Sequence, residues 1–258
     1  MVIPTVALPG AVEMPLVGLG TWQLRGRSAY QAVRHALDVG YRHIDTATIY
    51  RNEVEIGRAV RDSGLARSEV FITTKLWPND AGRERRTIAA SLAALGTDYV
   101  DLWLIHWPPR RGAGTSVWKE LVAIQRDGLA KAIGVSNYSP AQIDELAHAS
   151  GVLPAVDQIE WSPRLYDPQV ADALAERGVV LEGYSPFKTS RLSDPVLGEI
   201  ASHHGVTPAQ VVLRWHVDHG FVVIPKSAHP DRIAANWDVF GFSLSAAELA
   251  RIDALGRR

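Results

Sequence analysis

Short apolar runs alternate with amphipathic segments along the whole chain. Within the amphipathic segments, apolar residues recur at helical spacing, as at Val33, Ala36 and Leu37. Most of the apolar runs are continuous, which is typical of parallel strands that are buried on both faces. We therefore expect eight strands, at Leu16–Thr21, Arg42–Ala47, Val70–Leu76, Val100–Trp107, Lys131–Ser136, Ala155–Trp161, Val179–Ser185 and Phe221–Pro225.

The segments between these runs carry signals for the starts and ends of helices. Four of them begin with a possible capping box, in which two side chains satisfy each other's backbone N–H groups: Ser28 with Gln31, Ser139 with Gln142, Thr207 with Gln210, and Ser245 with Glu248. Two more begin with an aspartate N-cap followed by proline, at Asp167-Pro168 and Asp194-Pro195. Glycines stand where helices should stop, at Gly40, Gly128, Gly151, Gly178 and Gly220.

Eight strands that alternate with helices can form a doubly wound sheet or a closed barrel. The even spacing and the lack of a linker favour a (β/α)8 TIM barrel of the α/β class, and 258 residues is close to the size of one such barrel. Val6–Pro15, which contains Pro9-Gly10, predicts a β-hairpin covering the bottom of the barrel. Ser245–Leu255 predicts a C-terminal helix. We expect residues 1–258 to form this one domain.

Composition narrows the possible partners and locations. The formal net charge is −1, from 27 basic and 28 acidic residues, so nothing favours binding to nucleic acid or to an anionic membrane. The chain has no cysteine, which excludes disulfides, thiolate catalysis and cysteine-ligated metals. The first ten residues do not resemble a secretory signal, and no apolar run approaches the roughly 18 residues that span a bilayer. We expect a cytoplasmic protein.

Polar side chains follow most of the predicted strands. In barrel enzymes the carboxyl ends of the strands meet at one mouth, where the chemistry takes place. The side chains at those ends are Asp45, Lys75, His106, Ser136, Asn137, Gln158, Tyr184, Ser185, Lys226 and Ser227. Each alone could be an ordinary surface residue. An acid, a lysine and a histidine at one mouth together indicate a site with tuned pKa values.

The sequence predicts neither a metal site nor a Rossmann turn. The histidine clusters, His203-His204 and His216 with His219, lie on or beside a helix and have no carboxylate at ligand spacing. Gly18-Leu19-Gly20 lacks the third glycine and the following helix of a dinucleotide-binding turn. It indicates instead a close approach of backbones at a strand end.

Seven motifs resemble those of the aldo-keto reductase family, in the order and at the spacing found in that family. They are Asp45-Thr-Ala-Thr-Ile-Tyr50-Arg-Asn-Glu53, Thr73-Thr-Lys75-Leu-Trp77, Leu104-Ile-His106-Trp-Pro108, Gly134-Val-Ser136-Asn137, Asp157-Gln158-Ile-Glu160, Tyr184-Ser-Pro186 and Ile224-Pro-Lys226-Ser227. The resemblance extends from Val12 to about Leu255, and is greatest to bacterial 2,5-diketo-D-gluconate reductases. It implies NADPH-dependent reduction of aldehydes and ketones, including dicarbonyls or keto-sugars.

The resemblance also implies a catalytic tetrad of Asp45, Tyr50, Lys75 and His106. A carbonyl that receives a hydride becomes an alkoxide and needs a proton donor at its oxygen, which would be Tyr50. The Lys75 ammonium is expected to lower the pKa of the Tyr50 phenol, while Asp45 keeps Lys75 charged and oriented. His106 would hydrogen-bond the carbonyl and fix its approach to the cofactor.

Further residues match the family's cofactor and substrate positions. Those implied to bind NADPH are Ser136, Asn137, Gln158, Tyr184, Ser185, Lys226, Ser227, Arg232 and Asn236, of which Lys226, Ser227 and Arg232 match the positions that hold the 2′-phosphate. Trp22, Trp77 and Trp107 resemble the lining of the substrate pocket. The connections at Pro109–Thr115 and Phe187–Asp194 are short, so we expect an open mouth.

The chain departs from the family pattern at two positions near the cofactor residues. Ala235 stands where many members have a glutamate beside the adenine, which weakens the expected hold on that ring. Asp157 replaces the asparagine that usually precedes Gln158, so the orientation of the nicotinamide is expected to differ slightly.

Two other functions are compatible with the same residues. Lys75 could serve as the Schiff-base nucleophile of a barrel aldolase. Alternatively, the chain could bind NADP as a non-catalytic sensor, although its intact tetrad argues against this. The reductase is the favoured interpretation, acting as a monomer on small carbonyl substrates, with no metal, nucleic acid or membrane partner.

Overall fold

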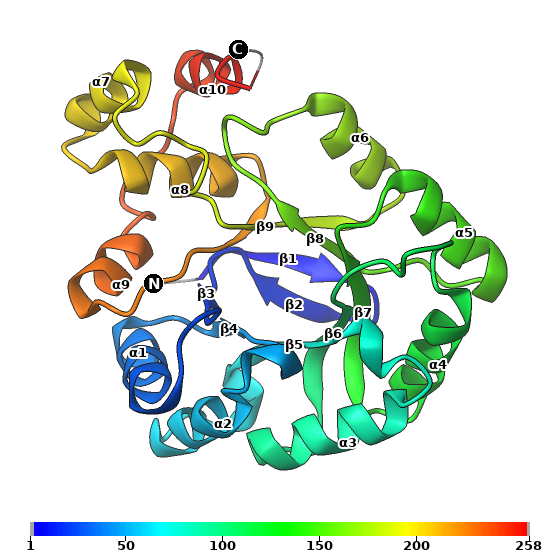
Figure 1. Cartoon of the computed structure of the whole chain (residues 1–258). Helices are drawn as coiled ribbons and strands as arrows, with labels where there is room; N and C mark the ends of the chain where they lie inside the picture. The colour runs from blue at the N-terminus through cyan, green and yellow to red at the C-terminus, as the bar shows by residue number, and fades with distance from the viewer. Residues whose placement is uncertain (1–2, 257–258) are drawn as a thin grey trace.

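Eight parallel strands form the centre of the computed structural model, which describes residues 3–256 (Figure 1). They are β3 Leu19–Gly20, β4 His43–Asp45, β5 Phe71–Leu76, β6 Val100–Ile105, β7 Ala130–Ser136, β8 Val156–Glu160, β9 Val180–Tyr184 and β10 Val222–Ile224. Each strand pairs with its neighbour in sequence. Backbone hydrogen bonds from Gly18 N to Val223 O (2.9 Å) and from Val223 N to Leu16 O (2.8 Å) join the first strand to the last. The predicted (β/α)8 barrel is therefore confirmed, with all eight strands.

Helices surround the barrel, and five of the ten described helices start at predicted caps. They are α1 Gly26–Val39, α2 Glu53–Asp62, α3 Glu84–Leu95, α4 Thr115–Arg126, α5 Pro140–Ser150, α6 Pro168–Glu176, α7 Pro195–His204, α8 Pro208–Asp218, α9 Pro230–Trp237 and α10 Ala246–Asp253. The capping boxes of α5, α8 and α10 and the aspartate caps of α6 and α7 are confirmed. The capping box at Ser28 is wrong, because Arg25 O already accepts a hydrogen bond from Ala29 N (3.4 Å) and α1 begins at Gly26.

An antiparallel hairpin closes the N-terminal end of the barrel, as predicted. It consists of β1 Thr5–Leu8 and β2 Val12–Pro15, and it lies across the centre of the ring in Figure 1. Leu8 and Met14 are buried in one cluster with side chains from the beginnings of the barrel strands, among them Phe71 and Val222. This apolar plug leaves the opposite end of the barrel for the polar strand ends.

Close backbone approach explains the glycines of the first strand. A Cβ at Gly18 would lie 2.5 Å from His43 Nδ1, and one at Gly20 would lie 2.8 Å from Ile224 O. The prediction made from Gly18-Leu19-Gly20 is thus confirmed. These glycines let β3 approach β10 closely while leaving interior space for His43.

Above the apolar plug, the barrel interior becomes polar. The inward positions of β4, β5, β8 and β9 carry a set of buried side chains that we call the polar layer: His43, Asp45, Thr73, Lys75, Gln158 and Glu182. His43 Nε2 lies 3.2 Å from Thr73 Oγ1 and 3.7 Å from a Glu182 carboxylate oxygen. Buried charges require partners, so this layer has to be understood as one network.

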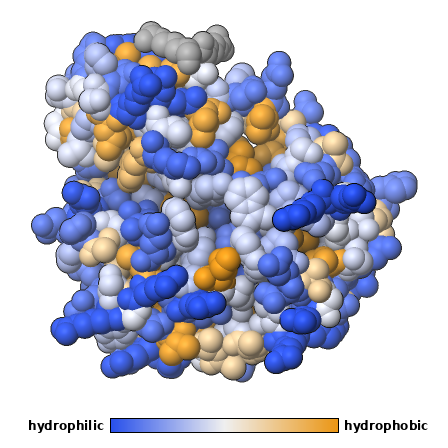
Figure 2. Space-filling view, in the orientation of Figure 1, coloured by the Kyte–Doolittle hydropathy of each residue, from blue (hydrophilic) through white to orange (hydrophobic). Residues whose placement is uncertain are grey.

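The outer surface is mostly polar. Figure 2 shows hydrophilic residues over most of the face it presents, with smaller groups of hydrophobic residues among them. Within residues 3–256, no helix has the length and apolar character needed to cross a lipid bilayer.

Two helical glycines provide a matched test of how tightly the outer ring packs. A Cβ at Gly57, in α2, would lie 2.1 Å from Leu95 O at the end of α3, whereas one at Gly198, in α7, would have no atom within 4 Å. We expect Gly57→Ala to lower the free energy of unfolding by about 1–3 kcal/mol through overpacking. Gly198→Ala should raise it by about 0.5–1 kcal/mol, because alanine restricts the unfolded chain. Denaturant unfolding of both variants would measure this, and equal effects would contradict the close α2–α3 contact.

Candidate active site

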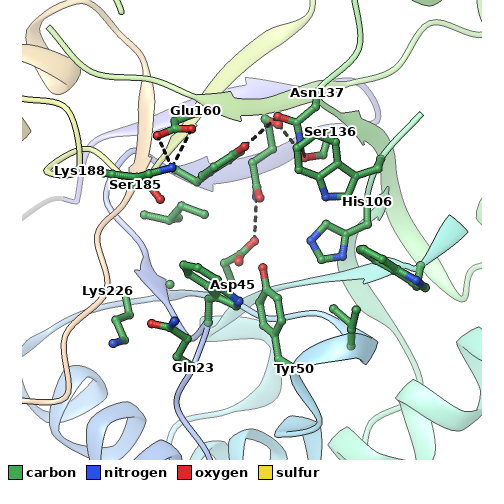
Figure 3. Close-up of a pocket in the computed structure, with 18 of the residues that line it drawn as sticks. Gln23, Asp45, Tyr50, His106, Ser136, Asn137, Glu160, Ser185, Lys188 and Lys226 are labelled. Atoms are coloured by element: carbon green, nitrogen blue, oxygen red, sulfur yellow. Dashed lines mark hydrogen bonds and ion pairs between the residues drawn. The ribbon is translucent and has the colours of Figure 1, made fainter. Parts of the chain in front are cut away.

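A cavity of about 560 Å³ opens at the carboxyl ends of the barrel strands. Twelve of the residues predicted from the sequence line it: Trp22, Asp45, Tyr50, Trp77, His106, Trp107, Ser136, Asn137, Gln158, Tyr184, Ser185 and Lys226. Figure 3 shows Tyr50 and His106 side by side in this cavity, with Asp45 close to Tyr50. The strand ends thus bring residues 200 positions apart into one site.

A buried ion pair forms the floor of the site. Lys75 Nζ donates to both carboxylate oxygens of Asp45, at 2.6 Å each, and to Thr46 O at 2.9 Å. Lys75 is fully buried and lies beneath the cavity lining. Burial opposes its charge, but the adjacent Asp45 raises the pKa of Lys75 above its ordinary value. Lys75 is therefore a fixed cation, as expected.

Tyr50 stands over this cation in a protonated form. It ends a short 3-10 turn, Thr48–Tyr50, after β4, and Lys75 Nζ lies 5.3 Å from its ring centroid. Lys75 lowers the pKa of Tyr50, as expected, but its effect is not the largest one. Burial raises the pKa of Tyr50 and Asp45 adds to it, and together they outweigh the opposing effect of Lys75. The phenol consequently keeps its proton at neutral pH, as a proton donor must.

His106 lies beside Tyr50 as a neutral imidazole. The two ring centroids are 5.6 Å apart, and Trp77 packs edge-on against His106 on its other side at 5.4 Å. Burial, assisted by the charge of Lys75, lowers the pKa of His106 to about 3. A neutral imidazole can donate one hydrogen bond into the cavity without adding a second positive charge.

Gln158 connects the Lys75–Asp45 ion pair to a second buried carboxyl group. Its side-chain amide nitrogen donates to Asp45 Oδ2 (2.8 Å) and to Glu182 Oε2 (2.9 Å). Burial and the neighbouring Asp45 raise the pKa of Glu182 to about 8, so Glu182 is neutral at lower pH. Both amide protons of Gln158 are thus engaged. Within residues 3–256 its side-chain oxygen, Oε1, accepts no hydrogen bond, and Gln158 lines the cavity.

The cavity wall next to Gln158 is a hydrogen-bonded chain. Asn137 Nδ2 donates to Ser136 Oγ (2.9 Å), which donates to Gln158 O (2.7 Å), and Tyr184 Oη donates to Asn137 Oδ1 (2.9 Å). Behind this wall, burial raises the pKa of Asp157 to about 7, and its carboxyl accepts from Tyr138 N (3.4 Å). Asp157 therefore supports the backbone that follows Asn137.

The cofactor residues predicted to hold the 2′-phosphate and the adenine lie on α9 or just before it, and of these only Lys226 lines the cavity. Lys226 lies on the cavity edge, and Arg232 is exposed in the first turn of α9. Neither has an ion-pair partner among the described residues. Ser227 Oγ accepts from His229 N (3.0 Å), while His229 caps α9 without a side-chain hydrogen bond. Asn236 is buried on the same helix.

The mouth presents large apolar side chains to solvent. Trp22 is 56% exposed, Trp107 is 43% exposed and Ile49 is 40% exposed, although all three line the cavity. Side chains of this size on the surface are usual at ligand sites. The expected open mouth, with tryptophans around it, agrees with this exposure.

Several residues of the site were missed in the sequence. Glu182 and Glu160 lie two residues from Tyr184 and Gln158 on their strands, so the two-residue alternation of side chains would have placed both inward. Lys188 Nζ pairs with Glu160 Oε1 at 3.1 Å on the cavity wall, but its loop position carries no periodic signal. The other missed lining residues are Gly20, Gln23, Arg25, Ile49 and Ile224.

Comparisons with known proteins agree with this arrangement. Residues 16–257 match the model of the aldo/keto reductase family. The chain is 44% identical to an aldo-keto reductase of Mycolicibacterium smegmatis, covering 98% of this chain and 93% of the relative, and 43% identical to a glyoxal reductase of Bacillus subtilis, with the same coverage. The crystal structure of a Bombyx mori aldo-keto reductase in complex with NADP superposes with a TM-score of 0.93 at 32% identity, covering 99% of this chain and 93% of that one.

The raised pKa of Glu182 predicts a specific pH dependence of stability. Between the ordinary value of 4.5 and about 8, Glu182 is protonated in the folded chain and ionised in the unfolded chain. Rising pH therefore lowers wild-type stability in this window, by at most about 1.4 kcal/mol per pH unit. Glu182→Gln accepts the same hydrogen bond and cannot ionise, so it should gain stability relative to the wild type as the pH rises from about 5 to 8. Denaturant unfolding at several pH values would measure the free energy of unfolding of both proteins. If the two free energies changed with pH in parallel, Glu182 would be ionised in the folded chain and the prediction would fail.

Proposed function

Because this chain belongs to the aldo/keto reductase family, whose members are NADP-dependent oxidoreductases, we propose that Tyr50, Lys75, Asp45 and His106 carry out its catalysis. The protein reduces aldehydes and ketones to alcohols with NADPH. The observation that carries the residue assignment is the buried Lys75–Asp45 pair beneath a protonated Tyr50.

The described residues fit the nicotinamide end of NADPH. The side-chain oxygen of Gln158, Oε1, has no hydrogen-bond donor among the described residues and can accept from the amide group of a carboxamide. The half-buried Tyr184 ring offers a face for stacking. Ser136, Asn137 and Ser185 complete this part of the proposed site. When bound, NADPH supplies the hydride that reduces the substrate.

The start of α9 fits a phosphate group. Lys226 and Arg232 are exposed cations, and the first N–H groups of α9 are not capped by a side chain. Helix N-termini and arginine both favour phosphate oxygens. We assign the 2′-phosphate to Lys226, Ser227 and Arg232, and the adenine to Asn236, with Ala235 leaving one side of that ring without a carboxylate.

Proton transfer is the task of Tyr50. A carbonyl oxygen placed between Tyr50 and His106 gains negative charge as carbon is reduced. Tyr50 gives its proton to that oxygen, and the phenolate left behind is stabilised by the Lys75 ammonium, which Asp45 holds in place. Neutral His106 donates a hydrogen bond that orients the carbonyl. Trp22, Trp77 and Trp107 form the walls against which the rest of the substrate packs.

Small dicarbonyls are the substrates that we favour. Their paired carbonyl groups are strongly electrophilic, so they need few binding contacts, and the mouth is open. The 43% identity to a glyoxal reductase supports the same class, and keto-sugars are a second class of suitable size.

The alternative of a Schiff-base aldolase conflicts with the position of Lys75. A nucleophilic lysine must be unprotonated and reach the substrate, whereas Lys75 is fully buried, paired with Asp45 and has a raised pKa. A non-catalytic sensor would not require the complete tetrad that this chain retains.

We also propose that residues 1–258 act as a single-domain monomer in the cytoplasm, without a nucleic-acid partner. The scattered hydrophobic groups of Figure 2 support the monomer. The near-zero net charge supports the absence of nucleic acid, and the lack of cysteine fits a reducing compartment.

The test of the proposed function is turnover by the purified protein. The loss of NADPH absorbance should follow addition of glyoxal, methylglyoxal, aromatic aldehydes or keto-sugars, with dicarbonyls among the fastest. A folded protein that binds NADPH but reduces no member of this panel would refute catalysis and favour the sensor.

Removal of the Tyr50 hydroxyl should separate chemistry from binding. Tyr50→Phe retains the ring but not the proton, so we expect kcat to fall by about 10²–10⁴-fold while the Kd for NADPH changes little. Steady-state kinetics and fluorescence titration would measure the two effects. Turnover within a few-fold of the wild type would exclude Tyr50 as the donor.

Cofactor preference should depend on Arg232. Arg232→Ala removes an exposed guanidinium, and we expect the Kd for NADPH to rise by about tenfold or more, with that for NADH nearly unchanged. Arg86→Ala is a suitable control, because Arg86 is an exposed arginine on α3 away from the cavity. Equal losses for NADPH and NADH would mean that Arg232 does not contact the 2′-phosphate.

A further inference from the structure

A second group of chemically active side chains lies in the outer ring, where α7 meets α10. His203 and His204 end α7, and Glu248 lies in the first turn of α10. His203 Nδ1 and His204 Nε2 each lie 3.0 Å from the same carboxylate oxygen, Glu248 Oε1. The sequence contained no sign of this arrangement, because Glu248 lies more than 40 positions beyond the histidines.

The capping box of α10 fixes the carboxylate. Glu248 Oε2 accepts from Ser245 N and Ser245 Oγ, at 2.8 Å each, so Oε1 is turned toward the two histidines. Burial would raise the pKa of Glu248, but the hydrogen bonds from Ser245 and the histidines lower it to about 2. The carboxylate is therefore ionised and held in a single orientation.

The two histidine rings are positioned from the other side. His204 is half-buried and packs against Phe242, with ring centroids 5.1 Å apart. His203 is exposed, and its ring centroid lies 4.7 Å from that of His204. One ligand is thus anchored and one is accessible, so a small ion could enter from solvent.

Two imidazole nitrogens and one carboxylate oxygen are ligands that zinc prefers. In a tetrahedral zinc site with bonds of about 2.0–2.2 Å, neighbouring ligand atoms lie about 3.3–3.5 Å apart. The nitrogen–oxygen distances of 3.0 Å are close to this spacing, and all three ligand atoms lie within 4.8 Å of one another. Each nitrogen–oxygen distance therefore has to increase by about 0.3–0.5 Å to admit an ion.

We propose that His203, His204 and Glu248 form a binding site for Zn²⁺ or a similar divalent transition-metal ion, with water completing the coordination. Within residues 3–256 this is the only group of three His, Asp or Glu side chains with such geometry. The comparable pair of His219 and Asp253 (2.9 Å) has no second histidine, and the same Asp253 oxygen also accepts from Trp215 Nε1 (2.7 Å).

The position of the site determines what the ion would do. It joins the end of α7 to the start of α10, and no residue of either helix lines the catalytic cavity. Figure 1 shows both helices on the outer ring. Metal binding therefore stabilises the docking of α10 on the barrel and leaves carbonyl reduction unchanged.

The test uses untagged full-length protein freed of metal with a chelator. At about pH 7.5, Zn²⁺ should bind with a stoichiometry of about one per chain in competition with a chromophoric chelator, and should raise the Tm. His203→Gln and Glu248→Gln should each weaken this binding by at least about tenfold. Glutamine at position 248 can still complete the capping box, so α10 keeps its start. Circular dichroism and NADPH turnover confirm that each variant is folded.

His148→Gln is the matched control, because His148 is a lone exposed histidine on α5. It removes one of the nine histidines, as His203→Gln does. Binding that survives His148→Gln but is lost in the other two variants supports the site. Absence of stoichiometric binding, or equal binding by all variants, would overturn the proposal and leave the cluster as a hydrogen-bonded contact between two helices.

Discussion

The buried ion pair of Lys75 and Asp45 is the interaction on which the rest of the site depends. An ammonium sealed inside a barrel is tolerated only because Asp45 lies 2.6 Å from it. Around this pair, burial favours the neutral forms of the neighbouring titratable side chains. Glu182 takes a proton, His106 loses one, and Tyr50 keeps its own. The protonation states that the proposed mechanism requires thus follow from one salt bridge and from burial.

Much of the fold could be predicted because its signals are local. Most of the eight strands lie in continuous apolar runs, and the capping boxes at Ser139, Thr207 and Ser245 act within three residues. The box predicted at Ser28 failed because the helix starts earlier, with a backbone hydrogen bond from Ala29 N to Arg25 O, which no side-chain pattern reveals. The hairpin was also predicted, although its packing partners come from distant strands.

The site was predicted less evenly. Residues at strand ends, such as Lys75 and Tyr184, could be read from their place in the motifs. Glu182 follows the same alternation but lies deeper, where a carboxyl is not expected without a structure to show its partners. The sequence correctly predicted that Lys75 lowers the pKa of Tyr50, but it did not reveal the burial that raises this pKa by more. Lys188 lies on a loop, where neither a family motif nor the alternation of strand side chains could predict its place in the site.

The hairpin at the base of the barrel limits the route by which protons can reach the site. Leu8, Met14 and the apolar side chains above them separate the polar layer from solvent at that end. Within the described residues, water therefore reaches the polar layer only from the mouth of the barrel. In the proposed mechanism, the proton that replaces the one given up by Tyr50 must therefore enter through the space that the substrate has just filled. In that mechanism Tyr50 is reprotonated only after the alcohol product has left. The hairpin at the opposite end of the barrel thus determines that product release comes before reprotonation in each catalytic cycle.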